Sequence, residues 1–97
     1  MVQFLSIVED TFAIEGRGLV IVPGIRLSDP SARVYVGDPL ELRRADGTTQ
    51  VTSVRGIEMG GRGDFIPLLL ADGITKDDVP IGTEVWLLRN EAKGGGA

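Results

Sequence analysis

The sequence predicts an all-β protein, a small closed barrel of six antiparallel strands with one short helical turn. Short runs rich in apolar and β-branched residues recur along the chain, and clusters of Gly, Pro, Asp and Ser separate them. A helical pattern occurs in a single short stretch. Because closure into a barrel removes the sheet edges of so small a protein, a barrel is favoured over an open sheet.

The expected strands form two hairpins followed by two further strands. The runs at residues 3–14 and 19–26 flank the turn residues Glu15-Gly16-Arg17-Gly18, which is the pattern of a β-hairpin. A second hairpin is expected where Ala45-Asp46-Gly47 joins two runs, with Gly47 suited to a positive φ angle. The two strands of this second hairpin are expected at residues 39–44 and 48–59. The fifth and sixth strands are expected at residues 65–71 and 84–89.

The one helical turn is expected at residues 75–79. Thr75 is a suitable N-cap, and Asp77 and Asp78 stand in the first turn, where a negative charge is favourable.

The apolar pattern also predicts the core. Alternation in Leu40-Glu41-Leu42-Arg43 is typical of a half-buried strand, whereas the runs at residues 19–22 and 66–70 are apolar on both faces and need cover on the outer side. That cover is expected from the N-terminal segment, from the excursion at residues 74–81, or from a partner surface. The residues expected to be buried are Ile21, Val54, Leu69 and Trp86.

The length and the apolar runs of the chain indicate its domain organisation and its expected location. The 97 residues are expected to form one domain at positions 1–90 and a flexible Gly-rich tail at positions 91–97. No apolar run approaches the about 20 residues that span a bilayer, and Glu9 and Asp10 interrupt the apolar start before a signal-peptide core could form. A cytoplasmic protein without membrane contact is therefore expected.

Charge and residue types argue against several classes of site. The net charge of −4 opposes general attraction to a phosphate backbone. Cys and His are absent, which removes disulfides, the usual zinc ligands and the commonest general base. No phosphate-loop motif is present, so this chain is not expected to bind GTP. The loop Gly60-Gly61-Arg62-Gly63 has backbone amides that suit an anion but is interpreted as a plain connection, and no cofactor, metal or catalytic residue is predicted.

Five segments in the same order as in a known family resemble the second domain, a β-barrel, of elongation factor Tu and related translational GTPases. The first segment is the hairpin at residues 7–22, in which an acidic pair, Phe12 and Ile14 precede the turn Gly16-Arg17-Gly18. The other four segments are Val36-Gly37-Asp38-Pro39-Leu40-Glu41-Leu42, Gly56-Ile57-Glu58-Met59, Leu68-Leu69-Leu70-Ala71-Asp72-Gly73-Ile74 and Val79-Pro80-Ile81-Gly82-Thr83-Glu84-Val85. Together the five span most of residues 7–88.

This resemblance implies a barrel that packs against a GTPase domain and helps to hold the aminoacylated end of tRNA. The family's Glu beside the terminal adenosine corresponds to Glu58, and its Gly-Arg-Gly turn corresponds to Gly16, Arg17 and Gly18, with Arg62 in the neighbouring loop. The chain departs from the family at Gly24, where the family has Arg, and near Asp72, where a charge is reversed.

Two functions follow from the sequence. The first is a non-catalytic, stand-alone binding module of the translation-factor type that docks a protein partner through its apolar strand surfaces. The alternative is an accessory module that retains contacts to tRNA or ribosomal RNA through Arg17, Glu58 and the Arg62 loop. The two are separable by salt, because RNA binding weakens steeply as the salt concentration rises.

Overall fold

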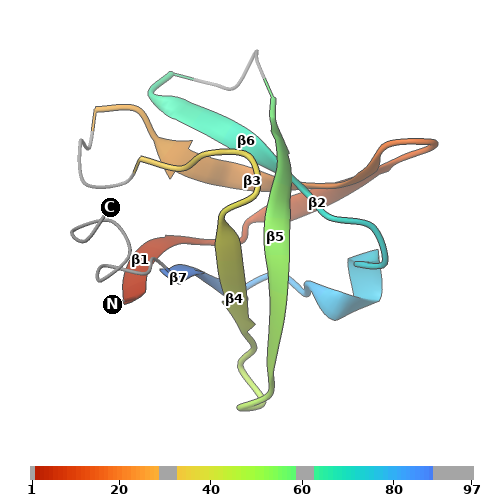
Figure 1. Ribbon diagram of the computed structural model, residues 1–97. Coiled ribbons are helices and arrows are strands. Elements are labelled where there is room, and N and C mark those ends of the chain that lie inside the picture. The colour runs from red at the N-terminus through yellow and green to blue at the C-terminus, as the bar shows by residue number, and fades with distance from the viewer. Residues whose placement is uncertain (1, 29–32, 59–62, 89–97) are drawn as a thin grey trace.

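The computed structural model describes residues 2–28, 33–58 and 63–88, and these form seven strands and one short helix (Figure 1). The predicted Gly-rich tail and Arg62 lie outside the described residues. The elements in chain order are β1 (Val2–Ile7), β2 (Asp10–Ile14), β3 (Gly18–Arg26), β4 (Pro39–Arg43), β5 (Thr49–Ile57), β6 (Phe65–Leu70), the 3-10 helix η2 (Lys76–Asp78) and β7 (Glu84–Leu88).

All strand pairs are antiparallel, and the strands form one sheet with the order β1-β7-β4-β5-β6-β3-β2. The sheet folds over on itself, so that the crossing strands in Figure 1 enclose a common interior. Its two ends, β1 and β2, are not paired with each other. The prediction of an all-β fold is confirmed, but the prediction of a closed six-stranded barrel is wrong.

The difference arises at Val8 and Glu9, in the middle of the expected first strand. The N–H of Val8 donates to the carbonyl oxygen of Thr83 at 2.8 Å, whereas the N–H of the next residue, Glu9, donates to Val22 at 2.9 Å. The chain therefore changes its partner at this point, from β7 to β3, and one predicted strand becomes two. Apolar periodicity cannot reveal such a change, because both halves keep an extended backbone.

Both predicted hairpins are confirmed. β2 pairs with β3 around the turn at residues 15–17, where the N–H of Arg17 donates to Ile14 at 2.9 Å. β4 pairs with β5 across a turn in which Gly47 has a φ of +90°. The turn chemistry read from Gly and Asp is local, so it specifies these two connections without help from the rest of the fold.

The core lies inside the folded sheet and contains residues of β3, β4, β5, β6 and β7, and Leu5 of β1 packs against it. Val8, between β1 and β2, and Val79, after η2, are each 1% exposed and pack in this cluster. The N-terminal segment and the excursion at residues 74–81 thus each contribute a buried side chain to the core. The cover expected on the outer side of β3 and β6 stays a prediction. The fully buried leucines and isoleucine of the cluster are Leu19, Ile21, Leu40, Leu42, Leu68, Leu70 and Leu87.

Of the four residues predicted to be buried, Ile21, Val54 and Leu69 are buried, and Trp86 is only half-buried. Trp86 lies between Val85 and Leu87, both of which point into the core, so alternation along β7 turns the indole outward. There it packs against Phe4 in an edge-to-face pair with ring centroids 5.4 Å apart, and the Arg43 guanidinium lies 4.2 Å from the ring centroid. The prediction for Trp86 is therefore wrong.

The predicted helical turn is confirmed as η2, which begins after Thr75. A carboxylate oxygen of Asp78 accepts hydrogen bonds from the Thr75 N–H at 2.8 Å and from the Thr75 hydroxyl at 3.1 Å. These bonds, with the backbone N–H contributing most, lower the pKa of Asp78 below its usual 3.8. The Asp78 carboxylate thus stabilises the N-terminal end of η2.

We expect this contact to make the fold sensitive to acid. Because the pKa of Asp78 is lower in the folded chain than in the unfolded chain, its stabilising effect is present above the unfolded pKa and is lost as the pH falls through the folded pKa. Urea unfolding at a series of pH values below about 5 should show a smaller loss of stability in Asp78→Asn than in the parent chain. The matched control is Asp77→Asn, because Asp77 has no hydrogen-bond partner within the described ranges; an equal change in both variants would contradict the assignment.

Candidate functional site

The structure brings together four of the five residues predicted to form a binding site. Gly16, Arg17 and Gly18 lie at the end of the β2–β3 hairpin, and Glu58 directly follows β5. Nη2 of Arg17 lies 2.6 Å from Oε2 of Glu58, and the two form an ion pair. The fifth residue, Arg62, lies outside the described residues.

The hairpin holds Arg17 in place through its two glycines. Gly16 has a φ of +80° in the turn, and Gly18 has a φ of +134° where β3 begins. A Cβ atom on Gly18 would lie 3.2 Å from the carbonyl oxygen of Leu70, so the hairpin base packs closely on the end of β6. Both positions favour glycine over other residues, which explains the spacing of the Gly-Arg-Gly turn.

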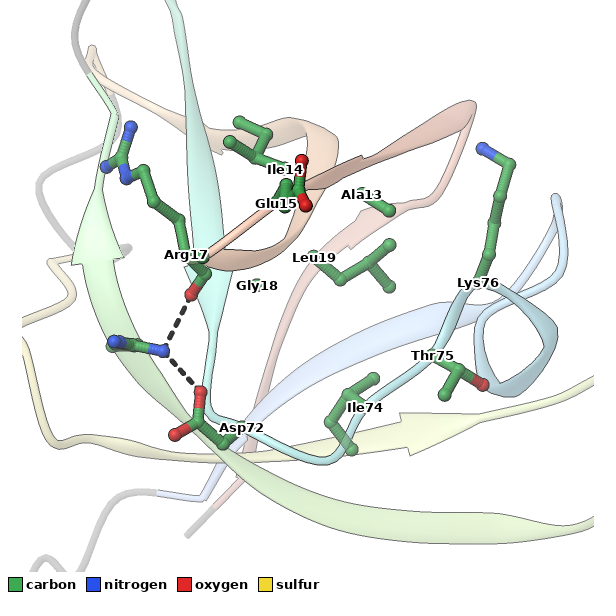
Figure 2. A pocket seen from close by; sticks show the side chains of 12 residues that line it. Ala13, Ile14, Glu15, Arg17, Gly18, Leu19, Asp72, Ile74, Thr75 and Lys76 are labelled. Carbon is green, nitrogen blue, oxygen red and sulfur yellow. Dashed lines mark hydrogen bonds and ion pairs between the residues drawn. The ribbon is translucent and has the colours of Figure 1, made fainter.

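A second ion pair lies beside the first. Arg55 on β5 pairs with Asp72, which follows β6, and the same nitrogen of Arg55 donates to the carbonyl oxygen of Arg17 at 2.6 Å. The dashed lines in Figure 2 mark these two interactions. Arg55 therefore connects the hairpin turn to the connection that follows β6.

These groups border an open cavity of about 530 Å³. Figure 2 shows Arg17 and Asp72 on one side of it and Lys76 on the other, with the apolar side chains of Leu19 and Ile74 between them. Lys76 Nζ donates to the backbone carbonyl oxygen and to the hydroxyl of Thr11, the latter at 3.1 Å. Apolar side chains thus line the base of the cavity, and charged side chains lie around its border.

Each cation at this cavity has a partner. Arg17 pairs with Glu58, Arg55 pairs with Asp72, and Lys76 is hydrogen-bonded to the edge of β2. The positive charge that a phosphate group would need is therefore largely balanced by neighbouring carboxylates. Exposed pairs of this kind contribute only about 0.2–1 kcal/mol each to stability, so they orient side chains more than they stabilise the fold.

Two further Arg residues lie at the end of β4. Arg43 pairs with Glu41 at 2.5 Å and lies over the Trp86 ring. Arg44 donates to the backbone carbonyl oxygen of Asp78 at 2.7 Å, so it connects β4 to η2.

No family model matches the chain. The resemblance to the second domain of translational GTPases therefore rests on the five sequence segments and remains a prediction. In the described part of the chain, no helix is long and apolar enough to cross a membrane.

Sequence reasoning missed the partnership of Arg55 with Asp72 and the position of Lys76 at the same cavity. The sequence singled out Asp72 only as a reversed charge, and it indicated no partner for Arg55. Their contact depends on how β5 and β6 pair, where Val54 faces Leu70 and a bulge follows. No local signal in the sequence specifies that register, because the bulge shifts the pairing by one residue.

Proposed function

We propose that this chain is a non-catalytic binding module of the translation-factor type that docks a protein partner. The observation that carries the proposal is a set of large apolar side chains left exposed on the two end strands of the sheet. They are Val2, Phe4 and Ile7 on β1 and Phe12 and Ile14 on β2, with exposed fractions of 37–51%.

End strands are where exposed apolar side chains have the greatest consequence. A strand at the end of a sheet carries unpaired N–H and C=O groups, and apolar side chains beside them make pairing with another chain favourable. Lys76 covers part of β2 by donating to the carbonyl oxygen of Thr11. The apolar side chains of β1 and β2 therefore support a protein-docking role.

The charges near the cavity favour a protein over RNA. Arg17, the residue through which the family resemblance implies RNA contact, is ion-paired with Glu58. RNA binding would have to break or share that pair against a net charge of −4. We therefore propose a protein partner, and contact with tRNA or ribosomal RNA is the alternative that the tests below distinguish from it.

Site-specific photocrosslinking in the native cells tests the docking role. With p-benzoylphenylalanine in place of Phe12, we expect irradiation to yield a discrete protein adduct that mass spectrometry can identify. The control places the same group at Asp46 in the exposed β4–β5 turn, where no adduct is expected. Nuclease-sensitive adducts at the Phe12 position, or equal adducts at both positions, would contradict the proposal.

A tRNA titration tests the alternative directly. We expect no saturable binding of labelled aminoacyl-tRNA at physiological salt, and no measurable effect of Arg17→Ala or Glu58→Ala. If binding occurs, falls with salt by about one logarithmic unit per phosphate contact, and is lost in Arg17→Ala, the RNA function replaces the protein one. Fluorescence anisotropy with charged and uncharged tRNA provides the measurement.

A further inference from the structure

A second cavity, of about 350 Å³, lies between β1 on one side and the last part of β3 with the start of β6 on the other. We call it the β1–β3 cavity, and it shares no lining residue with the cavity beside Arg17. Cα atoms of β1 and β3 approach within 8 Å, whereas an inserted strand would need about 10 Å between its two neighbours. The volume is at the lower end of the about 300–1,000 Å³ that is usual for small-molecule sites, so a small molecule is the occupant that fits.

Two opposite charges line the β1–β3 cavity, and no described residue balances either of them. Glu9 and Arg26 are both lining residues, and neither forms an ion pair with the other or with another described residue. At the first cavity, in contrast, Arg17 and Arg55 each have a carboxylate partner. Glu9 and Arg26 therefore suit a ligand that carries one positive and one negative group.

The two charges belong to opposite ends of the cavity. The N–H of Glu9 donates to the carbonyl oxygen of Val22 at 2.9 Å, so Glu9 lies beside Val22. Arg26 lies further along β3, at most roughly 13 Å from Val22 at about 3.3 Å per residue. There it pairs with Phe65 of β6, and its guanidinium carbon is 4.8 Å from the ring centroid, which holds the positive charge at that end. The charged groups of a matching ligand are consequently further apart than the adjacent ammonium and carboxylate of a single amino acid.

The rest of the cavity is apolar apart from one hydroxyl. Phe4 and Ile7 are 44% and 51% exposed, so apolar groups of a ligand would bury surface against them. Ser6 is 7% exposed, and its Oγ is the one buried side-chain oxygen or nitrogen in the described ranges without a hydrogen bond. A buried hydroxyl without a partner is costly, and rotation about χ1 brings it to a polar group of a ligand. The apolar lining residues are Phe4, Leu5, Ile7, Pro23 and Phe65.

We propose that the β1–β3 cavity binds an apolar dipeptide whose two termini are free. The α-ammonium group of the dipeptide pairs with Glu9, and its carboxylate pairs with Arg26. Its apolar side chains cover Phe4 and Ile7, and its amide group hydrogen-bonds to Ser6. Two residues at about 3.3–3.6 Å each separate the termini by roughly 7 Å at most, which suits two charges that line one cavity without meeting. This ligand site is additional to the protein-docking function proposed above.

Calorimetric titration of the intact chain with the dipeptide leucyl-leucine tests the site. The comparison ligands are its N-acetyl form, its C-terminal amide and free leucine. We expect saturable binding of the dipeptide at about millimolar concentration or below, and about tenfold weaker binding of each blocked form, which lacks one charged terminus. Free leucine should also bind more weakly, because it cannot reach both charges. In NMR spectra the largest amide shifts are expected in β1 and at residues 25–26.

Two variants assign each terminus of the dipeptide to its partner. Glu9→Gln should weaken the dipeptide about tenfold but leave the affinity for the N-acetyl form unchanged. Arg26→Gln should weaken the dipeptide equally but leave the affinity for the amide form unchanged. Because each variant is measured with two ligands, a loss of stability cannot imitate this pattern. Asp77→Asn, which removes a carboxylate from η2, is the control and should leave all affinities unchanged.

Three results would overturn the proposal. They are equal binding of the dipeptide and both blocked forms, no saturation by the dipeptide below about 10 mM, and binding of free leucine as tight as that of the dipeptide. Crosslinking at Phe12 tests the docking function independently, since Phe12 does not line this cavity. A protein adduct there without dipeptide binding would leave the docking function in place and remove only the dipeptide site.

Discussion

Replacing Gly24 with Ala is expected to destabilise the fold by about 2–5 kcal/mol, because it combines an unfavourable φ with a clash against backbone. Gly24 has a φ of +86° and lies in the bulge of β3 between Ile21 and Ile25. A Cβ atom there would lie 1.9 Å from the carbonyl oxygen of Ile66 and 2.7 Å from Cα of Pro67. Since the obstacle is backbone, the β3–β6 ladder itself would have to move apart.

The control for this prediction is Gly73→Ala. Gly73 has a φ of +93°, but an added Cβ would meet nothing within 4 Å, so only the conformational penalty of about 1 kcal/mol is expected. Denaturant unfolding followed by the fluorescence of Trp86 measures both losses. Similar losses in the two variants would show that the close approach of β3 to β6 is not as described.

Shortening the leucines of β6 is expected to have effects of similar size. Leu68 is fully buried in the core, so Leu68→Ala should cost about 3–5 kcal/mol through lost burial and the cavity left behind. Leu69 faces the other side of the sheet, where it is 4% exposed and packs against the backbone at Gly18 and Gly56. We expect Leu69→Ala to cost about 2–3 kcal/mol, near the lower end of the range for such changes.

Leu27→Ala is the matched surface control, because Leu27 is 58% exposed and should tolerate the change within about 0.5 kcal/mol. Calorimetric or denaturant unfolding of the three variants gives the comparison. A loss below about 1 kcal/mol at Leu69 would mean that this side of β6 is open to solvent. In that case the apolar outer surface of β3 and β6 would itself become a candidate for partner docking.

Local signals in the sequence were sufficient for much of the fold. The two hairpins follow from turn residues at fixed positions, and the short helix follows from Thr75 and Asp78, because each depends on contacts between neighbours in the chain. Burial of Ile21 and Val54 follows from their places within apolar strand segments. Alternation along β7 turns Trp86 outward, but the apolar character of its neighbours concealed this.

The candidate site was predicted in part. The sequence singled out Arg17 and Glu58, which lie far apart in the chain, through the family resemblance, and the structure places them in contact. It offered no means of knowing that they neutralise each other. That fact changes the chemical interpretation of the site, since a paired guanidinium has less to offer a phosphate group.

The sequence by itself determined the strand-rich class, the positions of the turns, the absence of Cys and His, and the surplus of acidic residues, because these depend on residue types and short-range spacing. Only the tertiary structure decided that the chain changes partners at Val8 and Glu9, that β1 and β2 are not paired with each other, and that Arg55 meets Asp72 beside Arg17. Each of these depends on pairing between distant strands, and the hydrophobic pattern of a strand specifies which face is buried but not which strand lies beside it.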